Sequence, residues 1–170
     1  MNIIEETITN KGVTLAALSE QQKVLVIFLR HLGCTFCRET LIFISKNKPI
    51  FEKNNTALVL VHPANDKTNP EYTLKEFNLE KEHRIASFNG ELYNAFGLKK
   101  GNLWQLLGPS VWWAIVRGFF ISNSGFGGIQ GDVTQLGGSF LLYKGQIIQS
   151  FRAKNAAQHA DYENMASCEI

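Results

Sequence analysis

The chain has 170 residues, of which 45% are hydrophobic, 19% are charged and 11% are aromatic, and its formal net charge is +2. This length predicts a single domain over residues 1–170 with a sizeable hydrophobic core. The composition differs from that of a disordered chain, a collagen or a disulfide-stapled mini-protein, and the near-neutral charge gives no reason to expect nucleic-acid binding.

The first residues are acidic. Glu5 and Glu6 stand where a secretory signal would carry positive charge and then an apolar run, so we expect no export signal and a cytoplasmic location. Thiols in that compartment stay reduced unless they are catalytic or redox-sensing, and we therefore interpret Cys34 and Cys37 as a working pair. Cys168, near the end of the chain, is expected to be a free thiol on a loose tail, with a resolving or partner-linking role as the alternative.

The first half of the chain alternates apolar runs with amphipathic segments. Residues 24–29 form a continuous apolar run, typical of a strand covered on both faces of a parallel sheet. Residues 36–47 carry apolar side chains three and four apart, which predicts a helix that stops before Pro49. A second strand follows at 57–61. This spacing predicts a right-handed crossover unit, and the loop after its first strand lies where such sheets usually place their sites.

Two further helices and a third strand are predicted next. Asn69 and Pro70 form a helix start, with a capping asparagine and a proline at the first helical position. A strand is expected at 84–88, followed by a turn and a short helix over 92–96. Gly97 can end that helix by taking the left-handed conformation.

Between residues 101 and 131 the only charged residue is Arg117, and all three tryptophans occur there. The uncharged run over 101–116 is shorter than the roughly 18 to 20 residues of a membrane span, so we expect no transmembrane segment. We favour a helical pair inserted at about 101–131 and packed on the core. The alternative is a hydrophobic dimer contact, a substrate lid or a membrane-surface patch. The glycine-rich loop over 122–132 lacks a phosphate-binding fingerprint.

The last part of the chain predicts a hairpin and a closing helix. Residues 139–143 and 146–151 have the pattern of two antiparallel strands joined by Lys144 and Gly145. Residues 155–166 can form a final helix. The order of elements predicts an α/β fold in which a mixed central sheet is flanked by helices.

The cysteine pair stands at the first turn of the helix that follows the first strand. Thiolate is the reactive form of cysteine, and the unpaired amides and the dipole at a helix start stabilise it. Arg30, His31 and Arg38 add positive charge nearby. Two intervening residues bring the sulfurs of Cys34 and Cys37 onto one helical turn, close enough for one to be oxidised and the other to resolve it as a disulfide. The pattern predicts a redox site.

Two other roles for the pair stay open. One is half of a structural zinc site, although the sequence contains no second close pair of cysteines; the histidines that could complete it are His31, His62, His83 and His159. The other is an inert buried pair in a domain whose role is binding.

Three blocks of the chain resemble the peroxiredoxin-like branch of the alkyl hydroperoxide reductase and thiol-specific antioxidant family, in the thioredoxin-like superfamily. The blocks are FLRHLGCTFCRE at 28–39, YNAFGL at 93–98 and GDVTQLGGSF at 131–140, and the likeness extends over about 12–166. This resemblance implies a thioredoxin-like fold. It also implies reduction of peroxides or disulfides by a dithiol that needs no metal or organic cofactor.

The chain departs from that family at three positions. Typical members read proline, three residues, threonine or serine, two residues and the attacking cysteine, which places Cys37 at the attacking position, Cys34 at the hydroxyl and Arg30 at the proline. They also carry an arginine three residues before a strand phenylalanine, where this chain has Gly137. Polarising a peroxide needs donors aimed at its oxygens. The arginines that could supply the missing charge are Arg30, Arg38 and Arg152.

The thioredoxin alignment implies the opposite roles, because in disulfide reductases the first cysteine of the pair is usually the attacker. Cys34 would then be the nucleophile and Cys37 the resolver; between the two, we favour Cys37 as the nucleophile. Thioredoxins also place a cis-proline opposite the pair, whereas glycines here would let a substrate backbone approach closely. The supporting residues of the expected site are Arg30, Thr35, Arg38, Gly137 and Gly138.

We therefore expect a thiol-disulfide oxidoreductase or peroxiredoxin-like peroxidase. Its substrate would be a peroxide or a disulfide, and an external thiol donor such as a thioredoxin or glutathione would regenerate it. A homodimer is a further expectation. The alternative from another class is a non-catalytic thioredoxin-fold module that binds a partner or a membrane through the aromatic residues of 103–121.

Overall fold

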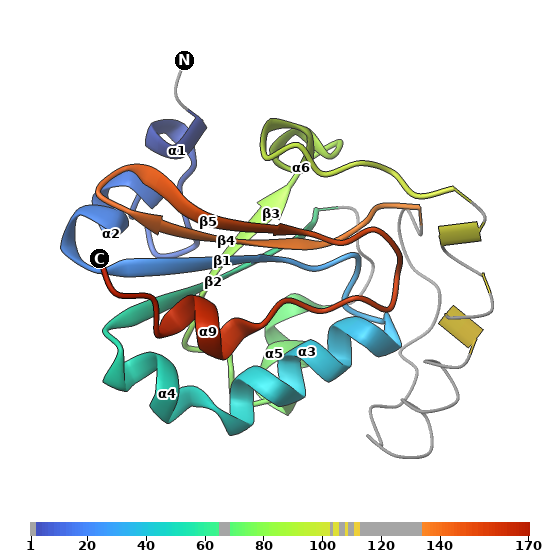
Figure 1. Ribbon diagram of the computed structural model, residues 1–170, viewed down its shortest axis with the longest axis horizontal. Coiled ribbons are helices and arrows are strands. Elements are labelled where there is room, and N and C mark those ends of the chain that lie inside the picture. The colour runs from blue at the N-terminus through green and yellow to red at the C-terminus, as the bar shows by residue number, and fades with distance from the viewer. Residues whose placement is uncertain (1–2, 65–68, 103, 106–107, 109–110, 113–133) are drawn as a thin grey trace.

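Five strands form one mixed sheet in the computed structural model, which describes residues 3–64, 69–102, 104–105, 108, 111–112 and 134–170 (Figure 1). The strand order is β3-β2-β1-β4-β5. The strands are β1 (Lys23–Phe28), β2 (Thr56–Pro63), β3 (His83–Ser87), β4 (Gly138–Tyr143) and β5 (Gln146–Arg152). The first three run parallel, β4 runs antiparallel to β1, and β5 antiparallel to β4.

The apolar run that the sequence predicts as a strand is the central strand β1. Because successive side chains of a strand point to opposite faces, Leu25 and Ile27 join one hydrophobic cluster while Val24, Val26 and Phe28 join the other. All five are buried. A strand that needs an apolar residue at every position is one covered on both sides, as predicted.

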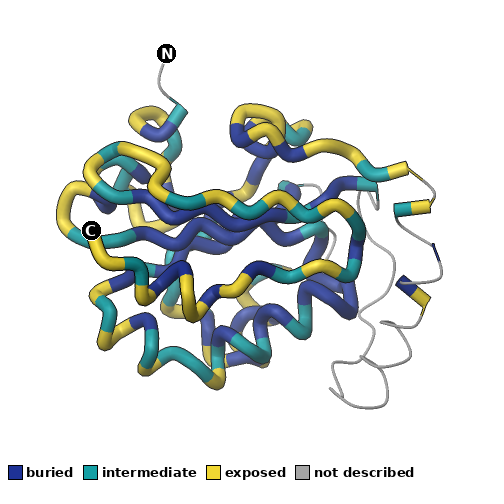
Figure 2. Tube along the Cα trace, viewed as in Figure 1, coloured by how far each residue is buried: buried dark blue, intermediate teal, exposed yellow. Residues whose placement is uncertain are grey.

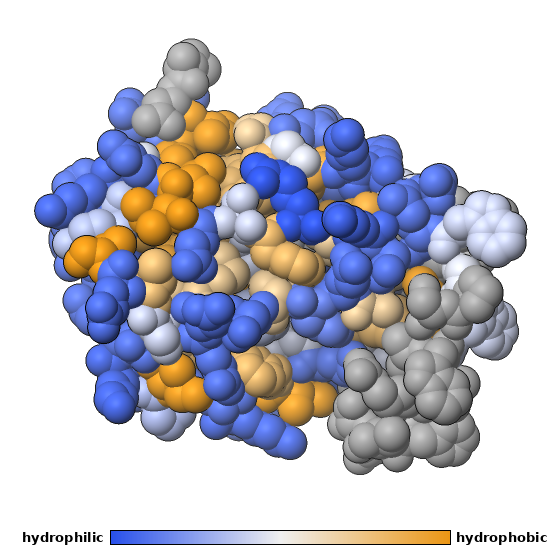
Figure 3. All heavy atoms as spheres, in the orientation of Figure 1, coloured by the Kyte–Doolittle hydropathy of each residue, from blue (hydrophilic) through white to orange (hydrophobic). Residues whose placement is uncertain are grey.

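Helices cover both faces of the sheet (Figure 1). On one face lie α3 (Thr35–Lys46), α4 (Lys48–Lys53), α5 (Pro70–Glu76) and α9 (Tyr162–Ala166); on the other lie α1 (Ile3–Glu6), α2 (Leu15–Gln21) and α6 (Glu91–Ala95). Figure 2 shows burial concentrated in the inner strands and along the sides of the helices that meet them, whereas β5 is exposed along much of its length. Figure 3 shows that polar atoms cover most of the face in view, with apolar atoms gathered near the start of β5 and the N-terminal helices.

Local signals place several element ends correctly. The side chain of Asn69 accepts hydrogen bonds from two amides at the start of α5, as a capping asparagine should. Gly97 ends α6 with φ at +70°. In the hairpin between β4 and β5, Lys144 and Gly145 both take positive φ, the geometry of the turn that matches strand twist. The helices α1, α2 and α4 were not predicted.

The predicted closing helix over 155–166 is wrong in extent, because the structure is helical only from Tyr162 to Ala166. The side chains of Asn155 and Gln158 accept hydrogen bonds from nearby backbone amides and so replace a helical first turn. The helix begins instead after Asp161, whose carboxylate accepts from the amide of Asn164. The irregular segment that replaces the first part of the predicted helix lies against α3, where His159 contacts Thr40.

The predicted helical insert at about 101–131 and its glycine-rich loop lie largely outside the described residues, so the helical pair stays a prediction. Within this stretch, Trp104 and Trp112 are 77% and 63% exposed, whereas Val111 is buried in the core. None of the helices in the described part of the chain is both long and apolar enough to cross a membrane.

Candidate redox site

The cysteine pair lies where β1 passes into α3, which confirms the predicted position. Cys34 is the N-cap residue of α3 and Cys37 lies in its first turn, with Thr35 as the first helical residue. Both cysteines are free thiols, and they are only 6% and 5% exposed. The pair therefore sits in the field of the helix start while being largely shielded from water.

Arg30 contacts both sulfurs. Its backbone amide donates to Cys37 Sγ at 3.2 Å, and its guanidinium Nη1 donates to Cys34 Sγ at 3.6 Å. The Nε of the same guanidinium donates to the carbonyl of Gln135 at 3.0 Å. The residue that stands in place of the family's proline thus brings a fixed positive charge to Cys34.

These contacts separate the two thiols electrostatically. The pKa of Cys34 is lowered from 9.0 to about 5, first because the Cys37 thiol donates a hydrogen bond to it and then because Arg30 and His31 place positive charge beside it; burial opposes the change. The pKa of Cys37 is raised well above its usual range, because Cys37 is the donor in that hydrogen bond and is buried. The reduced pair therefore holds its charge on Cys34 and its proton on Cys37.

The other two candidate arginines are engaged elsewhere. Arg38 donates to both carboxylate oxygens of Glu76, at 2.7 and 3.3 Å, and its guanidinium lies over the ring of Phe77. Arg152 donates to the carbonyl of Phe96 and lies over a phenylalanine of the opposite cluster. Of the three, Arg30 is the one whose guanidinium the structure places on a cysteine.

Backbone packing explains Gly137 and Gly138. A Cβ at Gly137 would lie 2.7 Å from the carbonyl oxygen of Phe28, and one at Gly138 would lie 2.7 Å from that of Phe151. A side chain is therefore excluded where the strands meet, and the arginine of typical peroxiredoxins has no room at position 137. The Arg30 side chain passes beside this position, with its Cγ 3.9 Å from the place that a Cβ of residue 137 would occupy. The positive charge at the site therefore comes from Arg30, just beyond the end of β1, and not from position 137.

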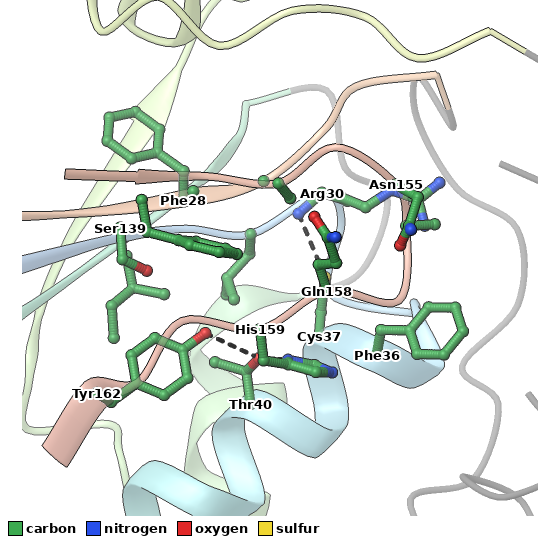
Figure 4. Close-up of a pocket in the computed structure, with 17 residues that line it drawn as sticks. Phe28, Arg30, Phe36, Cys37, Thr40, Ser139, Asn155, Gln158, His159 and Tyr162 are labelled. Atoms are coloured by element: carbon green, nitrogen blue, oxygen red, sulfur yellow. Dashed lines mark hydrogen bonds between the residues drawn. The ribbon is translucent and has the colours of Figure 1, made fainter. Parts of the chain in front are cut away.

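A small cavity opens beside Cys37, as Figure 4 shows. It leaves about 30 Å³ for the centres of water-sized molecules, enough for one or two waters or a molecule of similar size. Besides Arg30 and Cys37, its polar side chains come from α3, from β4 and from the segment that precedes and begins α9. They are Thr40, Ser139, Asn155, Gln158, His159 and Tyr162.

Three of these side chains form a polar chain that the sequence analysis did not assign. Thr40 Oγ1 lies 3.0 Å from His159 Nδ1 and 3.3 Å from the Tyr162 hydroxyl, and His159 Nε2 lies 3.3 Å from a carboxylate oxygen of Glu39. Cys37 and Thr40 share a face of α3 because they are three residues apart, which is the one part of this arrangement visible in the sequence. His159 was considered only as a zinc ligand. Among the described residues, no cluster of three or more histidine, cysteine and carboxylate side chains could hold a metal ion.

Tyr93, to which the sequence analysis also gave no role, supports the site from the opposite face of the sheet. Its buried hydroxyl donates to the carbonyl of Leu29 at 2.6 Å and lies 3.4 Å from that of Val61, and its ring meets Phe28 edge-on. The hydroxyl therefore ties together the ends of β1 and β2, immediately before Arg30.

Cys168 lies at the other end of the sheet. The Lys23 ammonium donates to the carbonyl of Cys168 at 3.0 Å, and Lys23 begins β1. The cysteine pair follows the opposite end of that strand, about 17 Å away at the rise of a β-strand. A disulfide needs Cα atoms within roughly 7 Å, so Cys168 does not resolve Cys34 or Cys37 within this chain as folded.

Comparisons with known proteins agree with the fold and with the resemblance. The chain is 27% identical over 173 residues to a prostamide/prostaglandin F synthase of Danio rerio, which covers 96% of this chain and 82% of the relative. Its structure resembles peroxiredoxin Q of Xanthomonas campestris, with a TM-score of 0.58 at 18% identity over 95% of this chain and 88% of that one. It also resembles the peroxidoxin BcpB of Mycobacterium tuberculosis, with a TM-score of 0.60 at 13% identity over 94% and 88%.

The structural likenesses confirm the thioredoxin-like fold predicted from the sequence, a mixed sheet flanked by helices. The family model described as AhpC/TSA antioxidant enzyme matches residues 43–155. That match begins after the cysteine pair, so the roles of Cys34 and Cys37 depend on their geometry. The chain belongs to the AhpC/TSA antioxidant enzyme family.

Proposed function

We propose that the protein reduces peroxides or disulfides by cycling Cys34 and Cys37 between dithiol and disulfide. The observation that carries this proposal is the geometry of the pair: Cys34 caps α3 with the Arg30 guanidinium 3.6 Å from its sulfur, and Cys37 lies in the first turn of the same helix. This geometry lowers the pKa of Cys34 to about 5, whereas the Cys37 thiol keeps its proton. At neutral pH such a pair combines a thiolate that can attack the substrate with a thiol that can then attack the resulting intermediate.

Cys34 attacks first in this proposal, which departs from our preference for Cys37 on sequence grounds. With a peroxide, the Cys34 thiolate takes the nearer oxygen, the O–O bond breaks, and the departing alkoxide or hydroxide takes up a proton. Cys34 is left as a sulfenic acid. The Arg30 guanidinium lies beside the Cys34 sulfur, where negative charge develops on the oxygens during this step. With a disulfide, the same thiolate displaces one sulfur and a mixed disulfide forms.

Cys37 then resolves the intermediate. Its sulfur attacks Cys34, the S–O or S–S bond to the substrate fragment breaks, and water or a free thiol leaves while the Cys34–Cys37 disulfide forms. An external dithiol, such as a thioredoxin, or two glutathione molecules supply the two electrons that return the pair to its reduced form. We place this cycle in the cytoplasm and ascribe no metal or organic cofactor to it.

The decisive experiment treats the reduced protein with one equivalent of hydrogen peroxide, an alkyl hydroperoxide or a model protein disulfide. We expect the loss of two thiols and a Cys34–Cys37 bond by peptide mass mapping. Cys168→Ser is the matched control, because Cys168 lies at the far end of β1, and it should behave as the wild type does. If all three oxidants leave the thiols intact, the proposal is wrong and the non-catalytic binding module gains support.

Single-cysteine variants assign the nucleophile. With Cys37→Ser we expect a sulfenic acid or a stable mixed disulfide on Cys34. With Cys34→Ser we expect slow oxidation of Cys37, whose proton is held tightly. Rapid sulfenic acid formation on Cys37 in Cys34→Ser would reverse the assignment.

The names of the curated relatives suggest a second candidate function, the synthesis of prostamide or prostaglandin F. The observation that favours it is that the alignment covers 96% of this chain and 82% of the Danio rerio protein. It is tested by product analysis with the reduced wild type, using Cys34→Ser as the negative control.

The homodimer expected from the sequence is a separate question, which light scattering of the purified protein tests.

A further inference from the structure

The described residues contain one buried polar chain beside the cysteine pair that the cycle above does not use. It runs from Glu39 through His159 and Thr40 to Tyr162, and the last three line the same cavity as Cys37 (Figure 4). We propose that this chain is a proton relay that takes the proton of the Cys37 thiol when Cys37 resolves the intermediate on Cys34, an inference that rests on the proposed function.

The hydrogen bonds can be oriented in one consistent direction. In the neutral tautomer that carries its proton on Nε2, which lies 3.3 Å from a Glu39 carboxylate oxygen, His159 accepts at Nδ1 from the Thr40 hydroxyl, and Thr40 in turn accepts from Tyr162. The Tyr162 and Thr40 hydroxyls then both donate toward the imidazole. A proton that enters at the Tyr162 oxygen can therefore leave at Nδ1 by one shift along each bond, without any heavy atom moving.

The chain reaches Cys37 through the cavity. Tyr162 is buried, and burial raises the pKa of its phenol, which therefore stays neutral and can both accept and donate. Cys37 and Thr40 lie on one face of α3, and the cavity beside them admits a water-sized molecule. In the proposed relay, water in this cavity links the Cys37 thiol to the Tyr162 oxygen.

The surroundings of His159 suit a group that gains and then loses a proton. From α3, the Glu39 carboxylate, only 10% exposed, faces Nε2 and would stabilise the imidazolium, and the ring of Phe36 lies edge-on to the imidazole. From the start of α9, Tyr162 faces Thr40 and is neutral. Arg30 lies across the cavity with its guanidinium directed to Cys34.

The resolving step needs such an acceptor. Cys37 keeps its proton while Cys34 is a thiolate, yet it must be a thiolate to attack the Cys34 sulfenic acid. In the proposed step the thiol proton passes along the relay to His159, the Cys37 sulfur forms the S–S bond, and the S–O bond breaks. The relay then returns one proton from the His159 imidazolium to the departing hydroxide, which leaves as water. His159 is neutral again at the end of the step.

The test separates the two chemical steps in the full-length protein. His159→Asn keeps an amide that can bond to Thr40 but cannot take up a proton near neutral pH. After rapid mixing with hydrogen peroxide, we expect sulfenic acid formation on Cys34, trapped with dimedone, to stay within about twofold of the wild type. Disulfide formation at pH 7 should slow by on the order of 100-fold, and the pH dependence of this step should change.

Two further variants complete the design. Tyr162→Phe removes one oxygen atom from the relay and should slow the second step alone, even if His159→Asn does not fold. His83→Asn is the matched control, because His83 begins β3 and bonds to Thr9 away from the site, and it should leave both steps unchanged.

The outcomes distinguish the relay from the proposed function. If the wild type forms no Cys34–Cys37 disulfide, the proposed function fails before any variant is made. If the wild type forms it and both relay variants keep its rate and pH profile, the relay is refuted. Equal slowing of the two steps also refutes it, because a merely structural role would disturb both.

Discussion

Arg30 offers the sharpest test of how the site works. Its guanidinium nitrogen lies 3.6 Å from the Cys34 sulfur. Two unit charges at that separation interact by about 5 kcal/mol at an effective dielectric constant of about 20, and a neighbouring opposite charge typically changes a pKa by about 1 to 3. We therefore expect Arg30→Met to raise the apparent pKa of Cys34 from about 5 to between about 6 and 8.

The difference in the thiolate fraction of Cys34 should be largest midway between the pKa values of the wild type and the variant. For a rise of about 2, this fraction at pH 6 falls from about 90% to about 10%, so alkylation of Cys34 slows about tenfold. The assay is the pH dependence of iodoacetamide labelling between pH 4 and 9, read on the Cys34 peptide by mass spectrometry. Arg30→Lys keeps a positive charge and should recover part of the shift.

Arg38→Met is the matched comparison, because that guanidinium is held by Glu76. Its labelling midpoint should stay close to that of the wild type. If Arg30→Met leaves the midpoint where it is, or if Arg38→Met moves it as far, then the charge that stabilises the Cys34 thiolate has been assigned to the wrong residue.

Three other predictions follow from particular contacts. Gly137→Ala brings a Cβ to 2.7 Å from the Phe28 carbonyl and should destabilise the protein by about 1 to 3 kcal/mol, seen as a lower Tm; an unchanged Tm would contradict the packing argument. Tyr93→Phe removes the hydroxyl that donates to the Leu29 carbonyl and should cost about 1 to 2 kcal/mol in urea denaturation, whereas an unchanged midpoint would mean that the bond contributes nothing. The free energy of unfolding of the reduced protein, relative to Cys34→Ser, should rise with pH between about 5 and 9, by at most about 1.4 kcal/mol per pH unit. The folded pKa of Cys34 lies below its ordinary value of 9.0, so this stability is complete above pH 9 and is lost as the pH falls through about 5; a flat difference would show that the pKa is not lowered.

Much of the fold is readable from local patterns in the sequence. The apolar run of β1 predicts a central strand because only a strand buried on both faces needs an apolar residue at every position. Asn69, Gly97 and the Lys144–Gly145 turn mark element ends because each satisfies a backbone requirement within a few residues. The same locality explains the error at 155–166, where a polar stretch compatible with a helix bonds to its own backbone instead.

The site divides along the same line. The sequence by itself places Cys34 and Cys37 at the start of a helix behind a buried strand, since residue spacing determines which side chains share one helical turn. It offers Arg30, Arg38 and Arg152 as equal sources of charge. The tertiary structure selects Arg30, because Gln135, more than a hundred residues away along the chain, anchors its guanidinium beside Cys34.

The second half of the site is visible only in the folded chain. Thr40 meets His159 across 119 residues of sequence and Tyr162 across 122. No local periodicity encodes such contacts, which exist because the sheet brings the segment before α9 back against α3. The sequence identifies the two sulfurs of the proposed site, whereas the packing of distant segments decides which sulfur is charged and what surrounds the other, because electrostatic interactions depend on distance in space and on burial.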